Sequence, residues 1–127
     1  MPVTSIKLNH INLPVTDVAA SSRFFEQYFS FKCTSVKGNN MLAILEGEGG
    51  FILVLTAESF NRDGNNHYPD AFHIGFLVDS HEQVTEIYDR LIKGGINVTQ
   101  PPGSLRGGYG FYFNALGNIL TEVTCLA

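Results

Sequence analysis

The chain repeats its own pattern of apolar and polar residues at about half its length. When the sequence is slid along itself until His10 falls on His73, each histidine is followed by Ile within an apolar stretch. The same shift superposes two apolar helix faces that recur at i, i+1, i+4 and i+5. Their members are Phe24, Phe25, Tyr28 and Phe29 in the first half and Ile87, Tyr88, Leu91 and Ile92 in the second. An internal repeat of this kind indicates two copies of one supersecondary unit.

Beyond the helices a slightly larger shift is needed. "MLAIL" from Met41 then matches "YGFYF" from Tyr109, and "GFILVLT" from Gly50 matches "NILTEVT" from Asn118. The extra residues fall in the Pro/Gly-rich segment 99–110, which we interpret as a loop because loops tolerate insertions. Each half therefore predicts a strand, a helix and up to three further strands.

Helix boundary signals agree with this division. Thr16 and Asp17 precede the first helix, while Asp79 and Glu82 have capping-box spacing before the second. The "KGG" at 93–95 is a helix stop.

We predict one domain over 1–127 with an α+β fold. It is built from module one at about 5–57, a polar linker or lid at 58–70, and module two at about 71–127.

Composition excludes several classes of protein. The net charge is −4 and the chain has no basic patch, which argues against nucleic-acid binding. Its apolar runs are too short to cross a bilayer and its start does not resemble a signal peptide, so we expect a cytoplasmic protein with no membrane partner. Cys33 and Cys125 lack CxxC spacing, which favours free thiols over a disulfide or a metal site.

Strand alternation places His10 and His73 on the strand faces that the helices do not cover. Glu122 stands among apolar residues of the last strand, and a buried carboxylate is unfavourable unless it is paired or binds a metal. If the two modules pack side by side, His10, His73 and Glu122 would form a two-His, one-carboxylate set of ligands. The fourth equivalent position is Val54, which cannot bind a metal. A strand histidine is also typical of a satisfied core or edge position, and Glu122 could stand exposed on an edge strand.

Three quoted stretches carry a resemblance to a known family. They are "LNHINLPVTDVAASSRFFEQYF", "FHIGFLVD" and "GFYFNALGNILTEVTC". Together they resemble the vicinal oxygen chelate superfamily of glyoxalase I, bleomycin-resistance proteins and extradiol dioxygenases. The resemblance implies two tandem βαβββ modules whose curved, cup-shaped mixed sheet encloses a metal, with helices outside. It places the first, third and fourth metal ligands on His10, His73 and Glu122, and the second on Val54.

The resemblance also separates the activities of the family. Glyoxalase I-like members carry a carboxylate or amide where this chain has Val54, which speaks against glyoxalase activity. Extradiol dioxygenases and fosfomycin-resistance thiol transferases use three protein ligands, as expected here. The dioxygenase pattern matches Tyr112 but has Pro where Leu116 stands, and the thiol transferases have Thr where Asn12 stands.

The resemblance implies an enzyme that binds Fe, Mn, Zn or Ni and a small oxygen-bearing substrate that chelates the ion. Glu122 and Tyr112 are the catalytic candidates, with Tyr112 as general acid or as an ordinary edge tyrosine. Asn12 and Arg106 are candidate substrate contacts, although Asn12 could cap a strand end and Arg106 could be a solvated loop residue. The alternative function is sequestration of a small molecule without metal. Family members with two modules also commonly form homodimers whose cups are shared between subunits.

Overall fold

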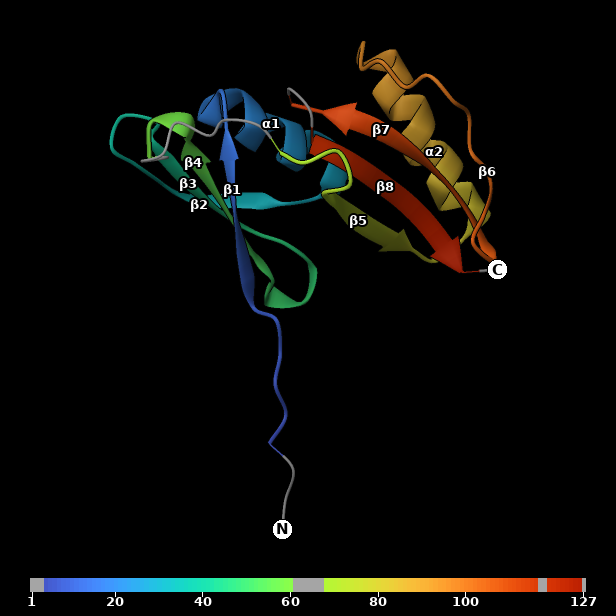
Figure 1. Cartoon of the computed structure of the whole chain (residues 1–127), viewed down its shortest axis with the longest axis horizontal. Coiled ribbons are helices and arrows are strands. Elements are labelled where there is room, and N and C mark those ends of the chain that lie inside the picture. The colour runs from blue at the N-terminus through green and yellow to red at the C-terminus, as the bar shows by residue number, and fades with distance from the viewer. Residues whose placement is uncertain (1–3, 61–67, 117–118, 127) are drawn as a thin grey trace. The chain divides into compact units, whose positions relative to one another are not determined.

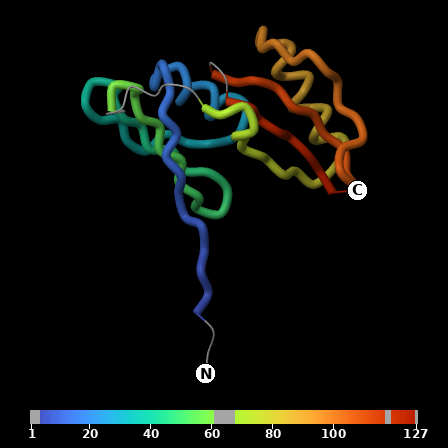
Figure 2. The backbone as a smooth tube through the Cα atoms, in the orientation of Figure 1, coloured from blue at the N-terminus to red at the C-terminus, as the bar shows by residue number. Residues whose placement is uncertain are grey.

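The computed structural model describes residues 4–60, 68–116 and 119–126. Its contacts divide the chain into two compact units, Met1–Asn66 and His67–Ala127. The first unit holds module one and the second holds module two, and Figure 2 follows the backbone through each. A strand, a helix and three further strands follow one another in the same order in both. The fold is α+β, with two tandem βαβββ modules, as the repeat predicts.

Each module is one helix on one four-stranded mixed sheet (Figure 1). The first and last strands of a module pair in parallel, and the other pairs are antiparallel. The sheet orders are β1-β4-β3-β2 and β5-β8-β7-β6. In module one the elements are β1 His10–Val15, α1 Val18–Phe29, β2 Lys32–Lys37, β3 Leu42–Glu46 and β4 Ile52–Ala57, with short 3-10 turns at Glu48–Gly50 and Glu58–Phe60. In module two they are β5 His73–Val78, α2 His81–Lys93, β6 Gly103–Leu105, β7 Gly108–Ala115 and β8 Ile119–Leu126.

The repeat in sequence is also a repeat in strand register. His10 of β1 lies opposite Ile52 of β4, and His73 of β5 lies opposite Leu120 of β8. Ile52 and Leu120 are the residues that coincide when "GFILVLT" is laid on "NILTEVT". The two modules therefore place equivalent residues at equivalent points of their sheets.

The helix starts were predicted correctly in one module and displaced by one residue in the other. Asp17 caps α1, and its side chain accepts a hydrogen bond of 2.9 Å from the backbone N–H of Ala20. The predicted Asp79–Glu82 capping box is wrong, because Ser80 is the N-cap of α2 and accepts from the N–H of Gln83 at 3.2 Å. Asp79 takes part only through its backbone N–H, which donates to the side chain of Gln83 at 2.7 Å.

The helices end in different ways. α2 ends at Lys93 before Gly94 and Gly95, the stop predicted from the sequence, and Gly95 has a φ of +82°. α1 ends at Phe29, and its C-cap Ser30 adopts the left-handed conformation at φ +58°.

Each core lies between its helix and its sheet. α1 packs on β2, β3 and β4, and α2 packs on β7 and β8 (Figure 1). Burying one large apolar side chain fully stabilises a fold by about 1.5–3 kcal/mol. Examples are Leu13, Phe25, Leu45 and Leu55 in module one and Val84, Leu91, Phe111 and Val123 in module two. The predicted apolar face of α2 was one residue too wide, because Ile92 is 45 % exposed.

Strand alternation separates the core face from the opposite face, as predicted. In β1, Leu13 and Val15 are buried, whereas His10 and Asn12 are exposed. In β5, His73 and Gly75 are likewise exposed. Both histidines therefore lie on the faces that the helices do not cover.

Two of the predicted connections contain regular structure. The segment 99–110, interpreted as a loop, contains β6 and the start of β7, joined by the two-residue turn Arg106–Gly107. Both turn residues have positive φ, +44° and +79°, as a tight hairpin turn requires. The predicted linker at 58–70 begins with the 3-10 turn Glu58–Phe60, and its residues 61–67 lie outside the described residues. Among the helices that the structure describes, none has the length and apolar character needed to span a membrane.

Candidate functional site

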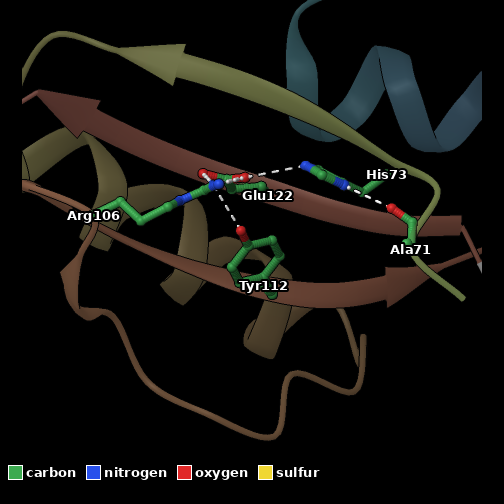
Figure 3. Close-up of polar contacts among 5 residues, drawn as sticks. All are labelled: Ala71, His73, Arg106, Tyr112 and Glu122. Atoms are coloured by element: carbon green, nitrogen blue, oxygen red, sulfur yellow. Dashed lines mark hydrogen bonds and ion pairs between the residues drawn. The ribbon is translucent and has the colours of Figure 1, made fainter.

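Glu122 is the centre of a polar cluster on module two. Its neighbours in β8, Thr121 and Val123, are buried in the core, so alternation turns Glu122 to the opposite face of the sheet. Glu122 is nevertheless only 8 % exposed. Three polar side chains, Arg106, Tyr112 and His73, converge on it (Figure 3). The sequence-based expectation that this carboxylate needs a partner is confirmed, and its closest partner is Arg106.

Arg106 holds both oxygens of the carboxylate. Its Nη2 donates to Oε1 of Glu122 at 2.6 Å and to Oε2 at 2.7 Å (Figure 3). Hydrogen bonding to Glu122 is the largest cause that raises the pKa of Arg106, followed by the carboxylate charge. The guanidinium therefore stays charged and neutralises Glu122.

Tyr112 completes the contact with Arg106. It lies opposite Glu122 in the β7–β8 register, and its hydroxyl oxygen accepts a hydrogen bond of 2.7 Å from Nη2 of Arg106. Burial is the largest cause that raises the pKa of Tyr112, followed by its hydrogen bonding to Glu122 and the charge there, while Arg106 opposes the rise. At neutral pH the phenol of Tyr112 is protonated, as an ordinary tyrosine is.

His73 approaches the cluster from β5. Its Nε2 lies 3.7 Å from Oε1 of Glu122, and its Nδ1 lies 3.0 Å from the carbonyl oxygen of Ala71 (Figure 3). Because a carbonyl oxygen only accepts, Nδ1 carries the proton in a neutral ring and Nε2 has a free lone pair. A backbone partner on the other ring nitrogen is typical of metal-binding histidines.

His10 repeats this arrangement in module one. Its Nδ1 lies 3.2 Å from Oδ1 of the Asn9 side chain, an acceptor, so in a neutral ring Nδ1 would carry the proton and Nε2 the lone pair. Asn12 does not cap a strand end: its Oδ1 accepts a hydrogen bond of 2.8 Å from the hydroxyl of Thr56. Val54 lies opposite Asn12 in the β1–β4 register.

The donor chemistry of these residues fits a divalent metal. Two imidazoles and one carboxylate form a set of donors that binds Fe, Mn or Zn. His73 and Glu122 lie on module two, and His10 lies on module one. Over the described residues, neither module by itself brings three His, Cys, Asp or Glu side chains close enough to hold one ion.

The Arg106–Glu122 ion pair was missed by sequence reasoning. Arg106 lies in a Gly-rich segment without periodicity, where a solvated side chain was the plain expectation. The one signal in the sequence was the Gly pair in "SLRGGYG", since such a dipeptide between apolar residues is typical of a hairpin turn.

Comparison with known proteins gives one family and many similar structures. The model of the Glyoxalase/Bleomycin resistance protein/Dioxygenase superfamily matches residues 7–123. No curated protein matches the sequence significantly.

Among solved structures, a possible glyoxalase from Bacillus cereus is 37% identical, with a TM-score of 0.82 over 95% of this chain and 100% of that one. A family enzyme from Burkholderia phytofirmans is 18% identical, with a TM-score of 0.82 over 96% of this chain and 100% of that one. A lactoylglutathione lyase from Agrobacterium tumefaciens is 22% identical, with a TM-score of 0.73 over 98% of this chain and 96% of that one. At these identities, the proteins from Burkholderia phytofirmans and Agrobacterium tumefaciens are similar to this chain in fold alone.

Proposed function

Because the chain belongs to the glyoxalase/bleomycin resistance protein/dioxygenase superfamily, we propose that it is a metal-dependent enzyme acting on a small oxygen-bearing molecule. His10, His73 and Glu122 would hold the divalent ion, which is Fe, Mn, Zn or Ni. Val54 leaves the second family position without a ligand, so three protein ligands leave positions open for substrate oxygens. This pattern favours dioxygenase-like or transferase-like chemistry over that of glyoxalase I.

The observation that carries the proposal is the state of the two histidines. Nδ1 of each ring lies within hydrogen-bond distance of a nearby oxygen, 3.2 Å from Asn9 Oδ1 for His10 and 3.0 Å from the Ala71 carbonyl oxygen for His73. In a neutral ring these contacts favour the tautomer whose Nε2 can bind an ion, at equivalent positions of the two modules.

The side chains of the site divide the chemical work. The bound ion would act as a Lewis acid that stabilises an enolate- or catecholate-like anion. Tyr112 carries a phenol proton at neutral pH that it could donate to a developing oxyanion. Asn12, fixed by Thr56 at 2.8 Å, presents its amide NH₂ as a donor to the substrate.

The alternative function is small-molecule sequestration without metal. The observation that favours it is the position of Arg106, whose guanidinium already supplies a positive charge to both oxygens of Glu122. A pocket neutralised in this way could hold a ligand without an ion.

We further propose that the chain forms a homodimer in which each metal site takes His10 from one subunit and His73 with Glu122 from the other. The family resemblance supports this arrangement. Cys33 and Cys125 are both free thiols, which suits the reducing cytoplasm.

Metal binding to untagged protein tests the proposal. We expect about one divalent ion per chain by elemental analysis and calorimetry. The variants His10→Ala, His73→Ala and Glu122→Gln should each lose it. His81→Ala, a change of an exposed histidine at the start of α2, is the control and should bind as the wild type does. Wild-type protein that binds no Fe(II), Mn(II), Zn(II) or Ni(II) would exclude the enzyme and leave sequestration.

A further inference from the structure

Nη2 of Arg106 lies between the two oxygens of the Glu122 carboxylate. Its distances to the two oxygens are nearly equal, 2.6 Å to Oε1 and 2.7 Å to Oε2. A cation at nearly equal distance from both oxygens lies on the bisector of the carboxylate, where a bidentate metal ion also binds. The arginine and an ion in that position therefore exclude each other.

The Arg106 side chain can leave this position without disturbing the core. Its side chain is 63 % exposed, so the guanidinium moves into water without crossing the core. Its backbone is unusual for arginine, because the φ of +44° belongs to a turn position that favours Gly, Asn or Asp. A residue poorly suited to its turn stands here, and its side chain reaches Glu122 and Tyr112.

We infer that Arg106 exchanges partners: it pairs with Glu122 while no ion is bound, and pairs with a carboxylate of the ligand once the metal has taken Glu122. This inference rests on the proposed metal-dependent function and names the class of its ligand, a small molecule with a carboxylate beside its chelating oxygens. The contact of Arg106 with Glu122 resembles the one proposed for the ligand, since Arg106 binds a carboxylate while it donates to the hydroxyl of Tyr112 (Figure 3).

Charge balance favours the exchange. With no ion bound, one guanidinium balances one carboxylate. A divalent ion that displaces Arg106 leaves an excess of positive charge beside the ion, because only Glu122 is negative in the cluster of described side chains. A ligand carboxylate at Arg106 offsets this excess. Metal and carboxylate should therefore bind cooperatively, and the coupling must be reciprocal.

The first experiment measures metal affinity in Arg106→Asn. Asparagine tolerates positive φ, so it preserves the turn, but it is too short to reach Glu122. We expect the variant to bind Zn(II) or Mn(II) about tenfold more tightly than the wild type, the scale on which neighbours of a ligand change metal affinity. Arg106→Lys keeps the charge without the planar fork and should lie between the two. Arg90→Gln removes the same charge from exposed Arg90 on α2 and should match the wild type.

The second experiment adds acetate, the simplest carboxylate, against chloride at equal ionic strength. Acetate should tighten metal binding to the wild type more than to Arg106→Asn. Because acetate complexes free metal equally in both titrations, the difference between the two proteins isolates Arg106.

The outcomes separate this inference from the proposed function. Equal or weaker metal binding by Arg106→Asn overturns the exchange and leaves the metal site standing. Tighter binding with the same acetate effect in both proteins overturns carboxylate recognition. No metal bound by either protein removes the proposed function, and the exchange with it.

Discussion

Module one and module two share the same strand order and differ in the side chains at the candidate site positions. In module two Tyr112 lies opposite Glu122, and in module one the equivalent pair is Ile44 opposite Val54. Register thus determines which positions lie on the helix-free face, whereas the side chains there decide what each module can bind. At this pair of positions module one is apolar, whereas module two carries a hydroxyl and a charge.

The hairpins that approach these pairs differ as well. β6 and β7 are joined by two residues, Arg106 and Gly107, whereas β2 and β3 are joined by the longer segment 38–41. The longer connection of module one carries no arginine. Glu122 and its counter-ion are therefore present together in one module and absent together from the other.

The largest effect is expected when the modules of two different chains are combined. His10→Ala and Glu122→Ala should each lose metal binding as homodimers. In a mixed dimer with shared sites, one site receives both defects and the other receives none. Binding should therefore return at about one ion per mixed dimer, measured by calorimetry after refolding the two together.

Mass spectrometry of the native mixture is the control, because it shows whether mixed dimers formed. Mixed dimers that bind no ion would rule out sharing between subunits while leaving the three ligands in place.

Val54→Glu should make module one resemble module two. A half-buried carboxylate without a partner should lower the free energy of unfolding of the metal-free protein by about 1–3 kcal/mol. A fourth ligand should then make the added metal stabilise this variant more than the wild type, as measured by thermal unfolding. Val54→Gln, similar in size but without the charge, is the matched control. The same loss of stability with and without metal would mean that Val54 does not face the ion.

The helix caps test whether the two modules are equally dependent on their first turns. Asp17→Ala and Ser80→Ala should each lower the free energy of unfolding by about 1 kcal/mol, because each leaves a helix N–H without its side-chain acceptor. Asp79→Ala should change it by less than about 0.5 kcal/mol, since that side chain caps nothing. Urea unfolding measures all three, and a larger loss for Asp79→Ala than for Ser80→Ala would contradict the assigned cap.

Titration of Tyr112 gives the smallest effect. Its pKa lies above the ordinary 10.0, so the folded protein holds this proton more tightly than the unfolded chain does. The resulting stability is present below about pH 10 and is lost as the pH rises through the folded pKa. Between about pH 9 and about pH 11 the wild type should lose more stability than Tyr112→Phe.

Ultraviolet difference absorbance between these two proteins should show a phenol that ionises above pH 10.0. In Arg106→Asn this ionisation should move higher still, because Arg106 lowers the pKa of Tyr112. A phenol that titrates at or below its ordinary pKa would contradict the described contacts.

Most of the fold could be predicted from the sequence, because repeat and periodicity are properties of regular backbone. His10 and His73 were placed on the helix-free faces by alternation alone, and the strand registers repeat with the offset that the sequence repeat predicts. The cap of α2 was displaced by one residue because Asp79 and Ser80 are both good N-caps, and only the backbone decides between them.

The candidate site was less accessible to prediction. Glu122 could be expected to need a partner, but its pairing with Arg106 depends on a two-residue turn inside a segment that was interpreted as a loop. The gathering of His10 with His73 and Glu122 stays a prediction, since it concerns two modules rather than one.

The short edge strand β6 should open more readily than the rest of its sheet. It has three residues at the edge of its sheet, where β2 of module one has six. Edge segments with so few backbone hydrogen bonds open first, and their amide protons exchange with solvent long before those of the core. Arg106 follows directly on this strand, so its hold on Glu122 should be interrupted each time the edge opens. Entry of an ion would then depend on local opening of the hairpin, and the protection of the amides of Gly103 and Leu105 in a hydrogen-exchange experiment would report how often the hairpin is found open.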